Sequence, residues 1–119
     1  MKIFWVNHAS FIFEHKKVRL ICDPWLSGTS FNEGWHLLAN TKFKIKDFSK
    51  ITHIWISHEH PDHFSPATFK NIPKEYLKNI TVLYQFTEDK KVLNFCQKLG
   101  FKTIEILPKI PLIISDNFT

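Results

Sequence analysis

Three of the seven histidines lie within six residues, at His58, His60 and His63, and Asp62 stands among them. Imidazole and carboxylate groups are ligands that suit Zn, Fe, Mn or Ni better than Ca or Mg. In an extended chain, residues i and i+2 project to the same side, so His58 and His60 can reach one cation. Pro61 then turns the chain and brings Asp62 and His63 toward the same space. The pattern predicts a metal site, and the alternative is a polar surface loop whose histidines form local hydrogen bonds.

Two elements must position this motif. Residues 51–57 are almost continuously apolar and rich in β-branched side chains, which predicts a buried strand directly before it. Ser65 and Pro66 follow it and are typical of the N-cap and the first position of a short helix. Glu59 lies between two of the imidazoles, so we expect it to point away from them and to have a structural role. The motif therefore occupies a loop at the carboxyl end of a strand.

The N-terminal part of the chain predicts further strands. Alternating and apolar runs predict strands over 2–7, 10–14 and 18–22, and the third run stops at Asp23-Pro24. Residues 25–50 carry many aromatic side chains without a regular period, which predicts a long loop with one helical turn. Loops of this length are more often functional than idle.

The C-terminal part predicts a strand–helix–strand unit. We expect strands over 80–84 and 103–107, joined by a helix that Thr87 caps and Gly100 ends, with Glu88 and Asp89 in its first turn. Such a unit implies parallel pairing of its two strands. Pro108 and Pro111 precede a last apolar run over 112–114.

Length and composition limit the class of protein. A chain of 119 residues with 44% hydrophobic and 23% charged residues predicts one globular domain. No apolar run approaches the ~20 residues of a membrane span, and the first residues lack the pattern of a signal peptide. We therefore expect a cytoplasmic protein without a membrane partner. Cys22 and Cys96 form no C-x-x-C pair, which predicts two buried residues rather than a disulfide or a thiolate zinc site.

The net charge of +5 comes almost entirely from lysine. Arg19 is the single arginine, and no basic stripe with interleaved aromatics is present, so nucleic acid is not expected as a partner. Lys42, Lys44, Lys46 and Lys50 form a loose basic patch. The patch is either a solvated face or an attraction for an anionic small-molecule substrate.

Two segments of the sequence resemble a known family. The run Ser57-His58-Glu59-His60-Pro61-Asp62-His63 is similar to the signature of the metallo-β-lactamase superfamily. A second match narrows the resemblance to the branch related to the metal-binding domain of CMP-N-acetylneuraminate hydroxylase; it consists of Asn7-His8-Ala9-Ser10-Phe11, Asp23-Pro24-Trp25-Leu26-x-Gly28, Phe31 and Trp35. The resemblance implies an αββα sandwich, mostly found in hydrolases with one or two metal ions.

The resemblance also implies a ligand set. His58 and His60 would be two of the three ligands of a first metal site, and Asp62 and His63 two ligands of a second. Asp62 would act in catalysis by holding the attacking water in line. The implied cofactor is zinc, as one or two ions, with iron or manganese as alternatives.

Two further residues match positions of the family outside the motif. Asp23 resembles the carboxylate that orients a ligating imidazole, and its other interpretation is a turn residue before proline. His8 matches a histidine near the mouth of the active site, on the substrate side, although a structural role is an equal alternative.

The resemblance covers only the N-terminal half of the family's domain. No histidine follows His63, so the downstream ligands of the family are absent from this chain. We therefore expect an α/β fold that is half of a metallo-β-lactamase-like sandwich, a single truncated domain over residues 1–119 with a mixed sheet and flanking helices. An open sheet face predicts self-association or a completing chain. The function expected is metal-dependent hydrolysis or one half of such an enzyme, and the alternative is a non-catalytic metal-binding or interaction fragment.

Overall fold

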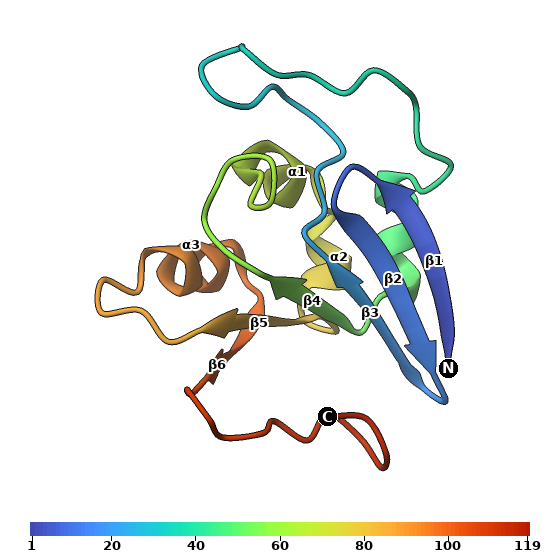
Figure 1. Ribbon diagram of the computed structural model, residues 1–119, viewed down its shortest axis with the longest axis vertical. Coiled ribbons are helices and arrows are strands. Elements are labelled where there is room, and N and C mark those ends of the chain that lie inside the picture. Colours follow the sequence, from blue (N-terminus) through green and yellow to red (C-terminus); the bar gives the residue numbers. More distant parts are fainter.

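A computed structural model describes all residues from Met1 to Thr119 and contains one six-stranded mixed sheet (Figure 1). The strands lie in the sheet in the same order as in the chain. The first three pair antiparallel, and the third to the sixth pair parallel. Their bounds are β1 Lys2–Asn7, β2 Ser10–His15, β3 Val18–Cys22, β4 His53–Ile56, β5 Thr81–Gln85 and β6 Lys102–Ile106.

The predicted strands are confirmed to within one residue at either end, with the exception of β4. The sequence predicted a strand over 51–57, whereas β4 is limited to 53–56. Ile51 instead closes a 3-10 helix, because its N–H donates to the carbonyl of Phe48 at 3.0 Å. Ser57 leaves the strand because its N–H donates to the Asp23 carboxylate at 2.7 Å. The parallel pairing of β5 with β6 is as predicted.

The sequence predicted two of the three short helical elements that precede β5. Helix α1, Pro66–Asn71, begins as expected, because the Ser65 hydroxyl accepts the N–H of Thr68 at 3.2 Å. The single helical turn expected in the long loop is the 3-10 helix η1, Ile45–Lys50. Helix α2, Lys74–Leu77, was not predicted, since four residues are too few to show a hydrophobic period.

The start of α3, Lys91–Leu99, corrects the prediction that Thr87 caps this helix with Glu88 and Asp89 in its first turn. The residue before the helix is Lys90, which adopts a left-handed conformation with φ of 52° and breaks the helical path. An Asp89 carboxylate oxygen accepts the N–H of Lys91 at 3.2 Å and so satisfies one free donor of the first turn. Gly100 ends the helix as predicted, with φ of 111°.

One face of the sheet packs against every helix of the chain. Ile21, Ile54, Ile56 and Val82 point to this face and are fully buried. They contact a core that includes residues of η1 and of all three α-helices, among them Phe48, Phe69, Leu77, Val92 and Cys96. Burial of one such aliphatic side chain contributes about 1.5–3 kcal/mol, so this layer supplies most of the apolar stabilisation. Cys22 and Cys96 are both buried and free, as predicted.

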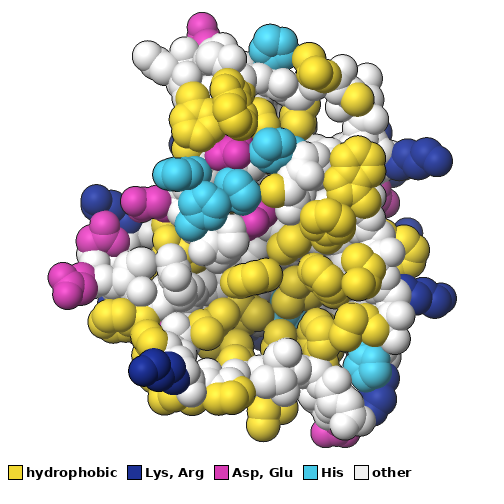
Figure 2. Space-filling view, viewed as in Figure 1, with side chains coloured by type: hydrophobic (Ala, Val, Ile, Leu, Met, Phe, Trp, Pro, Cys, Tyr) yellow, Lys and Arg dark blue, Asp and Glu magenta, His cyan; other side chains and the backbone are white.

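The opposite face of the sheet, called the open face below, carries a much smaller cluster. Val18, Leu20 and Leu83 are buried there, partly beneath side chains of the C-terminal segment 112–118. Trp55 and Ile104, which flank Leu83 in the register, are each 40% exposed. Figure 2 shows a broad hydrophobic area across the middle and lower part of the molecule. One covered and one uncovered face is the layering expected of half a sandwich. None of the helices has the length and apolar character needed to traverse a lipid bilayer.

Candidate metal centre

The sheet register brings three loops to one edge. In β2 and β3, Phe11 pairs with Cys22, and in β3 and β4, Cys22 pairs with Trp55. The turn between β1 and β2, the residue after β3 and the loop after β4 therefore lie side by side. These three segments supply His8, Asp23 and the residues from 57 to 63.

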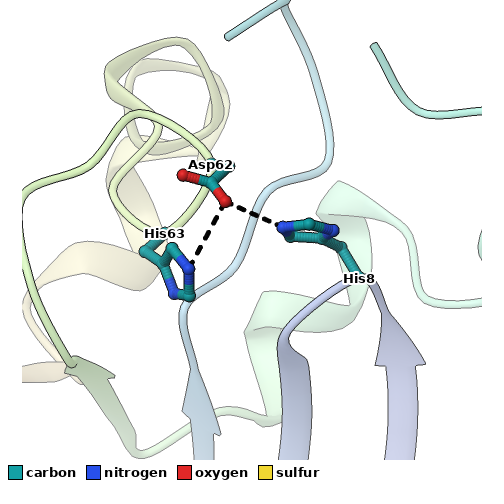
Figure 3. Close-up of side chains that lie close together, drawn as sticks. All are labelled: His8, Asp62 and His63. Carbon is teal, nitrogen blue, oxygen red and sulfur yellow. Dashed lines mark hydrogen bonds and ion pairs between the residues drawn. The ribbon is translucent and has the colours of Figure 1, made fainter. Parts of the chain in front are cut away.

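Two imidazoles converge on one carboxylate at this edge (Figure 3). The Oδ2 atom of Asp62 is 2.9 Å from Nε2 of His8 and 3.4 Å from Nε2 of His63. Each residue offers one ligand atom, and the three atoms lie within 4.8 Å of one another. The two histidines come from loops that are more than fifty positions apart in the chain, and the carboxylate lies between them.

The Asp62 carboxylate is buried and ionised. Its residue is 6% exposed, and its second oxygen, Oδ1, is buried without a hydrogen-bond partner. Burial raises the pKa of Asp62, but the hydrogen bond with His8, the backbone N–H of Asp62 and the electrostatic attraction of the neighbouring His63 and His8 rings outweigh burial and lower the pKa overall. A buried, ionised carboxylate with one oxygen that accepts no hydrogen bond is stabilised when a cation binds beside it.

The Asp23 carboxylate contacts His63 directly and His58 through Ser57. One oxygen accepts the backbone N–H of Ser57, and the other accepts the Ser57 hydroxyl, both at 2.7 Å. The second oxygen is also 2.9 Å from Nδ1 of His63, and the carboxylate can only accept, so His63 carries its proton on Nδ1. Because the Ser57 hydroxyl donates to Asp23, it accepts from Nδ1 of His58 at 2.9 Å. Both imidazoles thus keep Nε2 free as a ligand atom.

The other predicted ligands lie next to this group. The rings of His58 and His63 are 4.1 Å apart, and those of His58 and His60 are 4.6 Å apart. His58 is half-buried, whereas His60 and Glu59 are exposed. The ligand atoms that converge belong to His8, Asp62 and His63, and this set does not include His58 or His60. Ligation by His58 and His60 stays a prediction, as does the orienting role of Asp23.

Sequence reasoning missed two relationships. It predicted His8 on the substrate side or in a structural role, which stays a prediction, and it did not foresee the contact of the His8 Nε2 with Asp62. It gave no role to Ser57, which links Asp23 to His58. A signal for Ser57 was available, because a hydroxyl directly before a ligand histidine at a strand end can reach the neighbouring strand's end. No such signal existed for His8, whose position depends on a turn with φ of 38°.

The chemistry of the donor set fits a metal ion. With its proton on Nδ1, His63 directs a lone pair at a carboxylate oxygen 3.4 Å away, and two acceptors in this position repel unless a cation or a proton lies between them. His8 differs, because its Nε2 lies 2.9 Å from the same oxygen and donates a hydrogen bond to it, so His8 would have to carry its proton on Nδ1 in order to hold an ion through Nε2. Two imidazoles and one carboxylate are a donor set of both catalytic zinc and non-haem iron sites.

Comparisons with known proteins identify the family and the fold. Residues 2–108 match the model of the family described as "Beta-lactamase superfamily domain". The cytidine monophosphate-N-acetylneuraminic acid hydroxylase of Mus musculus is 30% identical over 110 residues, which are 91% of this chain and 19% of that protein. The chain therefore spans about a fifth of the curated relatives it matches.

Two solved structures share the fold. One is described as "a possible metal-dependent hydrolase from Veillonella parvula DSM 2008", with a TM-score of 0.63 and 20% identity over 85% of this chain and 40% of that chain. The other is an isothiocyanate hydrolase from Delia radicum gut bacteria, with a TM-score of 0.66 and 18% identity over 89% of this chain and 42% of that chain. With a family model that matches nearly its whole length, the chain belongs to the beta-lactamase superfamily domain family.

Proposed function

We propose that this chain carries the metal centre of a hydrolase, with one divalent transition metal held by His8, Asp62 and His63. The observation that carries the proposal is the convergence of two Nε2 atoms on a buried carboxylate oxygen whose partner oxygen has no hydrogen bond. When bound, such an ion lowers the pKa of a coordinated water toward neutrality and polarises a carbonyl or phosphoryl centre. Zinc is the first candidate, and iron and manganese are alternatives.

The residues around the proposed ion have different roles. Asp62 supplies the negative charge that holds the cation and orients the nucleophile beside it. Asp23 fixes the ring of His63 directly and that of His58 through Ser57, so neither ring has to reorient when the ion binds. His58 and His60 are the next ligands for a second ion, since their rings neighbour His63.

The fold neighbours support hydrolysis as the reaction class. One solved relative is described as a possible metal-dependent hydrolase and the other as an isothiocyanate hydrolase. The substrate would be a small molecule. We do not extend the substrate of either relative to this chain, because fold alone does not carry a substrate.

Metal binding tests the proposal first. The purified chain is stripped with a chelator, and zinc is then titrated against a chromophoric competitor. We expect about one tightly bound equivalent per chain, and about a hundredfold weaker binding in His8→Gln and Asp62→Asn. His15→Gln, far from the site on β2, is the matched control and should bind as the wild type does. Undiminished zinc affinity in both site variants would exclude this ligand set.

The second candidate function is a metal-binding fragment without catalysis. It is favoured by the small donor set, because only three ligand atoms converge and those of His58 and His60 are not among them. Hydrolysis of p-nitrophenyl acetate and bis(p-nitrophenyl) phosphate by the zinc-loaded chain separates the two candidates. Turnover above that of free zinc, and lost in Asp62→Asn, supports the hydrolase. Tight zinc without turnover supports the fragment.

We also propose a partner for the open face. Trp55, Ile104 and Ile3 are exposed there by 40%, 40% and 59%. A second copy of the chain, which carries the same apolar surface, would cover it by packing sheet against sheet. A different chain that completes the sandwich is the alternative partner, and sedimentation of a dilution series distinguishes the two.

A further inference from the structure

A pocket adjoins the metal centre at His8. It has a volume of about 510 Å³ and is lined mainly by Trp5, Trp25, Trp35, Leu37 and Leu38. Trp25 is buried and packs edge-on against the His8 ring at 5.3 Å, so it forms the floor of the pocket. Trp35 lies on the long loop, and its ring is edge-on to the same His8 ring at 6.2 Å. His8, a proposed metal ligand, therefore also lines the pocket.

The loop that carries Trp35 is held in an unusual conformation. Ser30 and Trp35 pair through two backbone hydrogen bonds of 2.9 and 3.0 Å. Between them Phe31, Asn32 and Glu33 have φ of 52°, 55° and 68°, three successive left-handed residues none of which is glycine. Each such residue is disfavoured for an L-amino acid. Local strain of this kind persists where the surrounding structure or the function requires it.

This turn holds two aromatic rings over the histidines. Phe31 and Trp35 pack edge-to-face at 5.0 Å, and Phe31 lies 6.1 Å from the ring of His60. Both rings are nonetheless 43% and 52% exposed. In Figure 2 hydrophobic side chains lie directly above the group of histidines. The strained turn keeps these apolar rings in solvent beside the candidate metal centre. Covering the rings with a bound group would remove their apolar surface from water and so stabilise the turn.

The pocket lacks formal charge. None of its ten lining residues is Lys, Arg, Asp or Glu, and the histidines are its only titratable groups. Lys42 and Lys50 of the basic patch line a different hollow, with Phe4 and Arg19. The surface next to the reacting centre therefore suits a neutral apolar group and offers no counter-charge to a phosphate or carboxylate.

We infer that the turn at 30–35 and the pocket behind it bind a neutral aromatic group of the substrate. The inference rests on the proposed function for the reaction that follows, but the binding itself needs no turnover. Trp35 and Trp25 would flank the ring of the substrate, and the bond to be cleaved would lie toward His8. The substrate class is thus a small neutral ester, amide or related acyl compound that carries an aryl group.

Ligand-observed NMR on the zinc-loaded chain tests the inference with phenylacetamide and acetamide as matched probes. The probes differ only in the aryl ring. We expect phenylacetamide to bind at least about tenfold tighter, and Trp35→Ala to reduce its affinity by about fivefold, as for loss of an aromatic pair. Trp35→Phe should recover part of the loss. Phe86→Ala removes an aromatic side chain that is 46% exposed and lies outside the pocket, and it should change nothing.

Gly34→Ala tests the turn while keeping every ring. A Cβ at this position would meet the Phe31 carbonyl oxygen at 2.9 Å, so the turn must open. We expect the preference for the aryl probe to fall although circular dichroism shows an intact fold. Equal affinity of the wild type for both probes, or a loss in Phe86→Ala equal to that in Trp35→Ala, would overturn the inference.

The zinc titration separates this inference from the proposed function. Loss of the aryl preference with normal zinc binding overturns the pocket and leaves the metal centre standing. An aryl preference that depends on Trp35 in a chain that binds no zinc supports the pocket and overturns the hydrolase.

Discussion

Replacement of Asp23 by asparagine tests the network behind the metal centre. Three donors point at this carboxylate, the N–H and hydroxyl of Ser57 and Nδ1 of His63. An amide has one accepting oxygen and one donating nitrogen. If the nitrogen takes the place of Oδ1, the N–H of Ser57 loses its acceptor, and if it takes the place of Oδ2, the hydroxyl and His63 both do. At least one buried donor is left unpaired in either orientation.

The size of the effect follows from these contacts. One unpaired buried donor costs about 1–3 kcal/mol of folding free energy. Loss of the carboxylate behind a ligand histidine typically weakens metal binding by about 10–100-fold, which corresponds to about 1.4–2.7 kcal/mol. We therefore expect Asp23→Asn to lower both the free energy of unfolding and the zinc affinity by amounts of this order.

Two measurements are needed on the same samples. Urea unfolding of the zinc-free chain gives the free energy of unfolding. Competition with a chromophoric chelator at pH 7.5 gives the zinc affinity. Asp89→Asn is the control, since Asp89 is exposed and pairs with Lys91 on the surface. Ser57→Ala should have a smaller effect on zinc than Asp23→Asn, because it disconnects His58 and leaves the bond from Asp23 to His63. Wild-type zinc affinity in folded Asp23→Asn would refute the reasoning.

Four further predictions concern stability, pH, thiol reactivity and assembly. Ile54→Ala removes a fully buried side chain and should cost about 2–5 kcal/mol in urea unfolding, whereas Ile110→Ala, 60% exposed, should cost almost nothing. Burial lowers the pKa of His53, so the unfolded chain binds more protons below pH ~6.5 and stability should fall as the pH drops through that value; His53→Gln should reduce the difference between unfolding at pH 7.5 and pH 5. Burial raises the pKa of Cys96 to about 12, so native protein should leave this thiol unmodified by a disulfide reagent at pH 8, and urea should expose it. Sedimentation of a dilution series should show a dimer that Trp55→Lys converts to monomer; a wild-type monomer at all concentrations would favour a completing chain instead.

The fold was predictable where hydrophobic pattern and local chemistry agree. Strands β1 to β3 follow from alternation, and α1 follows from the Ser-Pro start that the structure confirms. The failures occur where a long-range contact overrides the local pattern. Ser57 looks like the continuation of a strand, yet its N–H donates to a carboxylate on the neighbouring strand's end. Thr87 looks like a cap, yet the left-handed Lys90 sets the start of α3.

The sequence predicted which residue types form the candidate site, but not which of them lie together in space. The motif named Asp62 and His63 because their spacing after an apolar strand is visible in the sequence. The contact of His8 with Asp62 depends on the register of three strands, which no local pattern encodes. The same holds for the aromatic pair of Phe31 and Trp35, which a run of left-handed residues places beside His60 and His8.

The identity of strand order and chain order has a consequence for synthesis on the ribosome. Each strand pairs with the one made just before it, so the sheet can lengthen by one strand at a time without waiting for a distant partner. The growing edge is always the newest strand. His8 and Asp23 are already in place at the end of β1–β3 when the motif emerges, and the metal loop closes onto a platform that precedes it in time. Assembly of the centre can then be a local event in translation that is complete once α1 is made, before β5, α3 and β6 emerge.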